Sequence, residues 1–286
     1  MASLGEELLY TTCRLEGTVP GGTSVGTGFF YLHEQRLFLV TNKHVVHNMQ
    51  DGNFMLVKGE IRENQKYRVN RESYRIGFRE ANFIGHPNPD VDVAAMNISN
   101  IVTDLEAQGN YVYWKNITEK DVPTPEDIDK FISPIEEIVF IGYPSGIWDD
   151  VNILPVARKG ITATPYYIDF HGEQKFLIDA SVFPGSSGSP VFIYYAGSYP
   201  DKKGNLYAGS RIFFIGLVAQ VYQRLEEGEI VVRDIPTQQR PMAQVHQMID
   251  LGIVFKPVTV KETVEHYLAV VTTPNNQMQP TAERGG

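Results

Sequence analysis

Residues 183–190 read Phe-Pro-Gly-Ser-Ser-Gly-Ser-Pro and lead directly into the apolar run Val191-Phe192-Ile193. A serine on such a tight turn is exposed, and it can act as a nucleophile when a base lies beside it and amide donors face the developing oxyanion. Gly185 and Gly188 permit the backbone conformations that this requires. A Gly/Ser/Pro stretch is also an ordinary turn, so taken alone it leaves both interpretations open.

The spacing of this stretch excludes one class of hydrolase. The nucleophile elbow of α/β-hydrolases has glycine two residues after the serine, whereas Ser189 stands two residues after Ser187.

Two further segments carry groups that complete a nucleophilic site. His44 follows the apolar run 38–41, and Asp92 leads directly into the small apolar residues Val93-Ala94. In a catalytic triad a buried aspartate fixes the histidine tautomer and stabilises the imidazolium. A lone histidine is more often structural, and Asp92 has a rival in Asp90. We favour Asp92 because the apolar strand follows it directly.

Short β-rich runs separated by Gly, Pro, Asn and Asp dominate the chain, which indicates barrels or a sandwich rather than an α/β fold. The β-rich runs form two sets of six, and residues 100–135 between these sets are more polar. There Thr124-Pro125-Glu126-Asp127 predicts a short helix with an N-cap threonine and proline at its first position. The predicted strands are 7–15, 25–32, 36–41, 54–57, 67–74 and 93–98, then 137–143, 153–162, 176–180, 190–195, 211–221 and 252–256.

The end of the chain predicts one more helix. Thr259-Val260-Lys261-Glu262 reads as a capping box that opens a helix through about residue 270. The polar residues after it, rich in Pro, Asn and Gln, are typical of a disordered tail. The last of them, NNQMQPTAERGG, resemble the translated ends of integron gene cassettes, which would imply a mobile bacterial gene.

Composition narrows the function classes. The chain has 286 residues, 42% of them hydrophobic, and a net charge of −9, which argues against nucleic acid as a partner. Its single cysteine, Cys13, excludes an intramolecular disulfide and reads as a small buried hydrophobe.

There is no apolar run long enough for a membrane span. The histidines show no spacing typical of a metal site, so no cofactor or metal is expected. The N-terminus resembles no signal peptide, which predicts a cytoplasmic location unless a leader was removed.

Taken together, these segments resemble the trypsin-like (chymotrypsin-fold) serine peptidases, and most closely the bacterial HtrA-like branch. The chain order His, Asp, Ser is that of the family. Ser186 stands where animal trypsins carry aspartate, and Lys43 where the HtrA-like branch usually has alanine. The segments that carry the resemblance are 41–46 around His44, Asp92-Val93-Ala94, 185–190 around Ser187, 139–146 at the start of the second half, and Val25-Gly26-Thr27-Gly28-Phe29-Phe30.

The resemblance implies an all-β fold of two six-stranded antiparallel β-barrels, the chymotrypsin-like double barrel, with a C-terminal helix. The expected boundaries are 1–99 for the N-terminal barrel, 100–135 for a linker with a short helix, 136–257 for the C-terminal barrel, 258–271 for the helix and 272–286 for the tail. About thirty residues after the barrels are too few for a PDZ domain. No Ile-Val-Gly-Gly start is present, so trypsin-type zymogen activation is not expected.

The resemblance also implies a function: endopeptidase cleavage of peptide or unfolded protein through an acyl-enzyme. His44, Asp92 and Ser187 would form the triad, and the amides of Gly185 and Ser187, with Ser186 as a further candidate, the oxyanion hole. The specificity pocket would have its base at Ser181 and its wall at Ala219 and Gln220, without an acidic base, which favours an apolar or aromatic P1 residue. The alternatives are a catalytically silent binding or scaffold protein and a barrel whose serine cleaves only its own chain. The sequence leaves the substrate and oligomeric state open.

Overall fold

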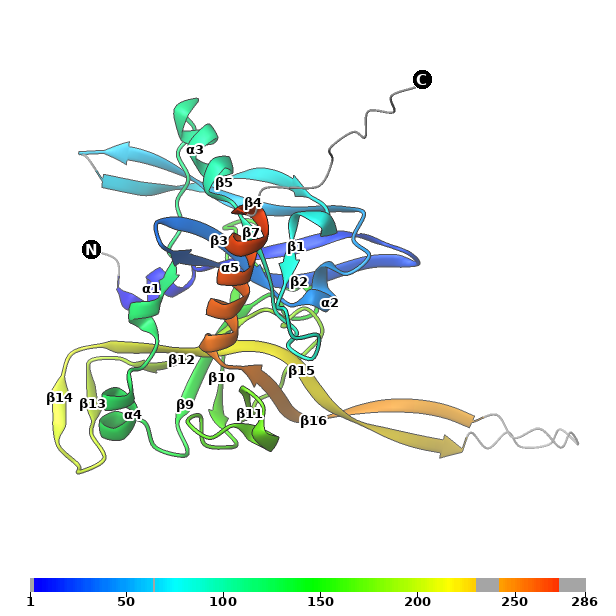
Figure 1. The fold of residues 1–286 in the computed structure, drawn as a ribbon, viewed down its shortest axis with the longest axis vertical. Coiled ribbons are helices and arrows are strands. Elements are labelled where there is room, and N and C mark those ends of the chain that lie inside the picture. The colour runs from blue at the N-terminus through cyan, green and yellow to red at the C-terminus, as the bar shows by residue number, and fades with distance from the viewer. Residues whose placement is uncertain (1–2, 64, 230–241, 273–286) are drawn as a thin grey trace, which may run out of the picture.

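The computed structural model describes residues 3–63, 65–229 and 242–272 and consists mainly of β-strands. Two β-structures lie one above the other in Figure 1, the N-terminal one in blue to cyan and the C-terminal one in green to orange. The last helix, α5 (Pro257–Thr272), follows the C-terminal strands and crosses to the N-terminal half. The all-β fold with a C-terminal helix is therefore confirmed.

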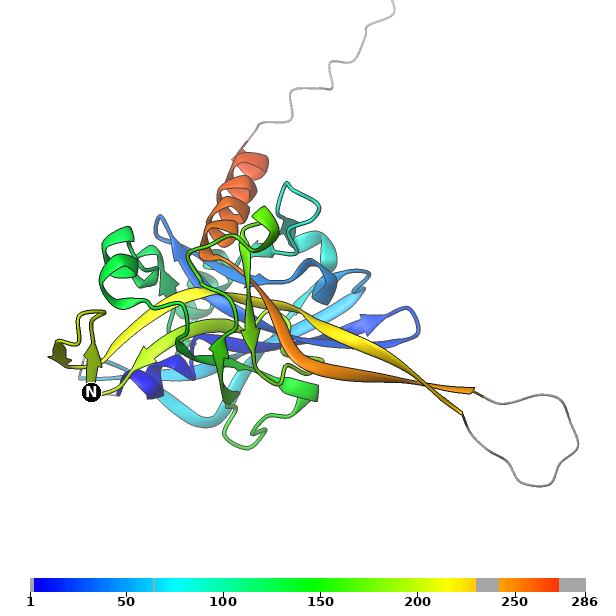
Figure 2. The same cartoon turned by 90° about the horizontal axis from the view of Figure 1, so that it is seen from below.

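The C-terminal half is a closed barrel of six antiparallel strands in the order β10-β11-β16-β15-β12-β9, as predicted. β15 and β16 run far past the predicted strand ends at 221 and 252 and continue as a two-stranded ribbon outside the barrel (Figure 2). A small hairpin, β13 (Ser198–Pro200) with β14 (Leu206–Ala208), follows β12. The barrel strands are β9 (Glu137–Gly142), β10 (Val156–Thr162), β11 (Lys175–Asp179), β12 (Pro190–Tyr195), β15 (Arg211–Glu229) and β16 (Met242–Phe255).

The N-terminal half is an eight-stranded sheet with the order β5-β4-β1-β2-β3-β7-β6, in which β8 pairs in parallel with β2. It contains more strands than the six predicted, because β6 and β8 are two-residue pairings that the sequence pattern does not show. Among the described residues no pairing joins its two end strands. The strands are β1 (Thr12–Val19), β2 (Gly22–His33), β3 (Arg36–Thr41), β4 (Asp51–Arg62), β5 (Gln65–Phe78), β6 (Ile84–Gly85), β7 (Ala94–Asn97) and β8 (Ile117–Thr118).

Short helices connect these strands. α4 (Pro125–Phe131) is the predicted linker helix, and the Thr124 hydroxyl accepts the Asp127 amide as an N-cap should. The first predicted strand begins too early, because α1 (Leu4–Leu8) occupies its start behind a capping box formed by Ser3 and Glu6. The other helices are α2 (Lys43–Val46), α3 (Ser99–Ala107) and the 3₁₀ turns η1 (Glu80–Asn82), η2 (Glu119–Asp121), η3 (Pro144–Gly146) and η4 (Phe170–Gly172).

The capping box predicted at Thr259 is wrong, although the helix itself is confirmed. α5 begins two residues earlier at Pro257, which suits the first turn of a helix. Thr259 is buried inside that turn, and its hydroxyl donates to the Lys256 carbonyl at 2.8 Å. No described helix is long and apolar enough to span a membrane. The predicted tail, from residue 273 on, lies outside the described residues.

Three apolar clusters form the core, and one of them crosses between the halves. Phe29 of β2 packs against Phe214 of β15 with ring centroids 5.5 Å apart, and Val260 of α5 joins the same cluster. Each half has a further cluster of its own. Cys13 belongs to the N-terminal one at 2% exposure, where burial raises the pKa of its thiol. It is the small buried hydrophobe expected from the sequence.

Thr27 of β2 forms a polar link between the halves. It is fully buried, and its hydroxyl donates to the Gly185 carbonyl at 2.9 Å. The same oxygen accepts the Tyr143 amide at 3.2 Å and the Ser189 hydroxyl at 3.3 Å, so its one donor and two acceptor sites are all used. The Thr27 amide donates to the Ser187 carbonyl at 2.9 Å. The turn that carries Ser187 is thereby fixed to the N-terminal sheet.

Replacing Thr27 by valine keeps the shape of the side chain but leaves the Gly185 carbonyl and the Tyr143 amide without their partner. We expect the free energy of unfolding in urea to fall by about 1–3 kcal/mol, the usual penalty for unpaired buried polar groups. Thr27→Ser keeps the hydroxyl and should lose less. Thr23→Val, at an exposed position on the same strand, is the matched control. Equal stability of Thr27→Val and Thr23→Val would contradict the linking role.

Candidate active site

Two consecutive turns hold Ser187 just before β12. The Ser186 amide donates to the Phe183 carbonyl at 2.9 Å, and the Ser189 amide donates to the Ser186 carbonyl at 3.0 Å. Gly188 has φ +85°, and a Cβ there would lie 2.0 Å from the Thr27 carbonyl oxygen. Only glycine therefore fits between this turn and the N-terminal sheet.

The directions of the Gly185 and Ser187 amides are set by the carbonyl groups that precede them. The Pro184 carbonyl accepts the Ser145 amide from η3, and the Ser186 carbonyl accepts the Ser189 amide. All described peptide bonds are trans, so the following N–H groups, those of Gly185 and Ser187, point in the opposite directions. Neither amide has a hydrogen-bond partner among the described residues. The Ser186 amide already donates to the Phe183 carbonyl, so it is not free to bind an oxyanion. The expectation that Ser186 could be a further oxyanion donor is therefore wrong.

His44 and Asp92 are joined by two hydrogen bonds. His44 lies in α2, directly after β3, and Asp92 lies in the loop from β6 to β7. The His44 Nδ1 is 2.5 Å from Asp92 Oδ2, and the His44 amide donates to Asp92 Oδ1 at 3.1 Å. Asn42, the N-cap residue of α2, donates its side-chain amide to the Asp92 carbonyl at 2.6 Å. The Asp92 side chain is 14% exposed and that of His44 49%.

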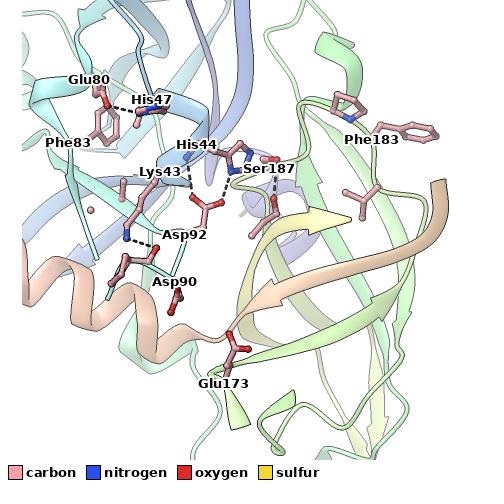
Figure 3. A pocket seen from close by; sticks show the side chains of 17 residues that line it. Lys43, His44, His47, Glu80, Phe83, Asp90, Asp92, Glu173, Phe183 and Ser187 are labelled. Carbon is pink, nitrogen blue, oxygen red and sulfur yellow. Dashed lines mark hydrogen bonds and ion pairs between the residues drawn. The ribbon is translucent and has the colours of Figure 1, made fainter. Parts of the chain in front are cut away.

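Asp90, the rival of Asp92, is oriented differently. Its amide donates to the Asn88 side chain at 3.0 Å, and its side chain lines the same cleft without contacting His44 (Figure 3). Lys43 lies nearby, where its Nζ donates to the Asn88 carbonyl at 2.9 Å. Burial lowers the pKa of Lys43, while the carboxylates of Asp92 and Asp90 act in the opposite direction. Lys43 thus holds this loop against the helix that carries His44.

Ser187 shares one cleft with His44 and Asp92, and Figure 3 shows the three side chains grouped in it. The Ser187 hydroxyl donates to the Ala219 carbonyl at 3.4 Å, and the structure describes no hydrogen bond from this hydroxyl to His44. The cleft has a volume of about 1280 Å³. It is lined by Lys43, His44, Val46, His47, Glu80, Phe83, Gly85, Pro89, Asp90, Asp92, Ala94, Glu173, Val182, Phe183, Pro184, Ser187 and Ala219.

The predicted specificity pocket is only partly represented in this cleft. Ala219 lines it, whereas Ser181 is not among the lining residues. The side chain of Gln220 is not among those that the structure describes. Val182, which no sequence motif singles out, lies in the wall instead, directly before the serine segment 183–190. No group of three or more metal-ligating side chains is found in the part of the chain that is described.

Ser186 carries an unpaired buried hydroxyl. The residue is 1% exposed, and its Oγ has no hydrogen-bond partner among the described residues. Its side chain therefore contributes no polar contact here, in contrast to Ser189, whose hydroxyl reaches Thr27.

We expect Ser186→Ala to leave the free energy of unfolding unchanged or to raise it, because an unpaired buried hydroxyl carries a desolvation penalty of roughly 1–3 kcal/mol. Ser189→Ala is the matched control on the same turn and should lower stability. Urea titration of both variants measures the difference. A clear loss of stability in Ser186→Ala would show that its hydroxyl has a partner.

A comparison with protein families identifies a known domain in this chain. The family described as the trypsin-like peptidase domain matches residues 26–198, more than half of the chain. No curated protein sequence matches the chain. Among solved structures, the Rv3671c protease from M. tuberculosis in its active form is 16% identical, with 96% of this chain and 85% of that chain covered and a TM-score of 0.45.

Two further solved structures show a similar degree of likeness. The serine endoprotease from Yersinia pestis is 12% identical, with 94% of this chain and 68% of that chain covered and a TM-score of 0.46. The HtrA-type protease AlgW with a tripeptide is 13% identical, with 93% of this chain and 62% of that chain covered and a TM-score of 0.43. On the strength of the match over residues 26–198, the chain belongs to the trypsin-like peptidase domain family.

Proposed function

We propose that the chain is a serine endopeptidase in which Ser187 is the nucleophile, His44 the general base and Asp92 the group that orients it. The observation that carries this proposal is the pair of hydrogen bonds that the Asp92 carboxylate accepts from the ring and the amide of His44. An Nδ1–H that donates to the carboxylate leaves Nε2 as the unprotonated nitrogen. His44 is then in the tautomer that can accept a proton from a serine hydroxyl.

The reaction follows from these roles. His44 Nε2 takes the proton of Ser187 as its Oγ bonds to the scissile carbonyl carbon, and Asp92 stabilises the resulting imidazolium. The imidazolium then protonates the amide nitrogen, the C–N bond breaks and an acyl-enzyme remains. Water, deprotonated by the same His44, attacks the ester. The second product leaves with its carboxyl group, and the Ser187 hydroxyl is restored.

The tetrahedral oxyanion would be held by the amides of Gly185 and Ser187. This assignment is supported by the orientation of the two amides. The amides of Ser145 and Ser189 bind the carbonyls that precede them, those of Pro184 and Ser186. Each such donor is worth on the order of 3 kcal/mol of the barrier, because it faces the charge before the reaction begins. The resting bond from Ser187 to Ala219 is long, and hydrogen bonds of catalytic groups commonly tighten only when substrate is present.

For substrate, we propose unstructured peptide segments with a medium-sized apolar P1 residue. Val182 and Ala219 are buried apolar residues that line the cleft with Ser187, and Phe183 is 41% exposed beside them. The carboxylates Asp90 and Glu173 lie on another side of the cleft in Figure 3.

Cleavage of a peptide library is expected to be enriched for apolar P1 residues, and a preference for arginine or lysine would contradict this assignment.

Reaction with a fluorophosphonate probe tests the nucleophile. The wild-type protein should be labelled and Ser187→Ala should not.

Asp92→Asn should bind peptide normally while kcat falls by about 10⁴-fold, the loss seen when the triad histidine is held in the wrong tautomer. Asp90→Asn, in the same loop, is the control and should retain most of the activity.

The outcomes separate the competing functions. Folded wild-type protein that binds peptide without labelling or turnover would favour a binding or scaffold protein. Labelling of Ser187 together with cleavage of the protein's own chain, but of no added peptide, would favour a self-cleaving barrel.

A further inference from the structure

The loop that carries Asp92, between β6 and β7, is fastened at its start by a histidine that the proposed reaction does not use. His86 follows β6 directly, and its side chain is only 6% exposed. Its amide donates to the Val93 carbonyl at 2.8 Å, which closes the base of the loop. The ring therefore lies at the point where the loop leaves the sheet and returns to it.

Both ring nitrogens of His86 have partners, and these define its tautomer. Nδ1 accepts the Asn88 amide at 3.0 Å, so this nitrogen carries no proton. Nε2 then carries the hydrogen and donates it to Glu262 Oε2 at 2.9 Å. The second Glu262 oxygen is 3.5 Å from the side-chain nitrogen of Gln174. A neutral histidine is thus held between the loop and α5.

The hydrogen bonds continue from His86 toward Asp92. Asn88, which His86 fixes through its amide, accepts the Asp90 amide on its side chain at 3.0 Å and the Val91 amide on its carbonyl at 3.3 Å. The same carbonyl accepts Lys43 Nζ at 2.9 Å. The loop is therefore held by α5 at one end and by the neighbour of His44 at the other.

α5 is itself firmly packed, so the backbone that carries Glu262 is held in place. Val260 and Val264 of this helix are fully buried in the cluster that the two halves share. Tyr267 packs edge-on against Phe38 of β3, with ring centroids 5.5 Å apart. Figure 1 shows the helix crossing from the barrel to the N-terminal sheet. Glu262 thus connects the C-terminal end of the fold to the loop of Asp92.

We propose that Glu262 is a positioning residue: through His86 it holds the loop in which Asp92 binds and orients His44. The kinetic part of this inference rests on the proposed function, whereas the orientation of His44 by Asp92 can be measured without it. Glu262 does not line the cleft, so its loss should change the chemical step and not the binding of peptide. Without the carboxylate, the buried Nε2–H of His86 loses the acceptor that holds the ring, so that ring and loop are free to shift.

Glu262→Ala is the decisive variant. We expect kcat to fall by about 10- to 100-fold with KM unchanged, since a displacement of about 1 Å in a catalytic group has effects of this size. The downfield proton NMR signal of the His44 Nδ1–H, identified by its loss in Asp92→Asn, should shift or disappear. Glu262→Gln keeps one oxygen that can accept from His86 and should retain most of both readouts.

Glu265→Ala is the matched control, because Glu265 lies on the same helix, is exposed, and forms its ion pair with Lys261 of that helix at 3.9 Å rather than with the loop of Asp92. It should leave kcat and the NMR signal unchanged. If Glu262→Ala fails to fold, Glu262→Asp keeps the charge while shortening the reach to His86, and it should show the same losses.

Wild-type kcat and an intact His44 signal in folded Glu262→Ala, or in Glu262→Asp, would overturn the inference, and so would a rise in KM alone. A wild-type protein that no fluorophosphonate labels would instead remove the proposed function. In that case the NMR signal of the Glu262 variants still decides whether Glu262 positions the loop.

Discussion

The hydrogen bonds of Thr27 are the contact on which the arrangement of the site depends. The triad candidates come from different halves: His44 and Asp92 stand on the N-terminal sheet, whereas Ser187 stands on the C-terminal barrel. The shared apolar cluster presses the halves together, but apolar packing is non-directional. The buried hydroxyl and amide of Thr27 add direction, because they bind the carbonyls of Gly185 and Ser187. They fix where the serine turn lies relative to His44.

Much of the fold could be predicted because it follows from local patterns. Every predicted strand overlaps an observed one, and the Thr124 cap begins a helix as expected. What the sequence did not show depends on partners that are distant in the chain. β8 is a strand only because it pairs with β2, and the extra length of β15 and β16 exists only because the two strands pair with each other.

The same division applies to the site. His44, Asp92 and Ser187 were found from order and motif, and the structure places them in one cleft. The sequence favours Asp92 over Asp90 as the partner of His44 but cannot exclude Asp90, because the two differ in loop geometry and not in residue type. Glu262 and His86 are 176 residues apart, and neither belongs to a motif that pairs them. The engaged amide of Ser186 depends on how the turn closes, which a Gly/Ser sequence leaves open.

The distances along the chain also set an order of events during synthesis. The partners of the Thr27 hydroxyl lie 116, 158 and 162 residues further on, and Glu262 comes later still. Such contacts form late, since the chain between them must first be made and folded. His44 and Asp92 leave the ribosome long before the elements that hold them in place. A nascent chain therefore contains His44 and Asp92 well before the residues that fix the serine turn beside them have been made.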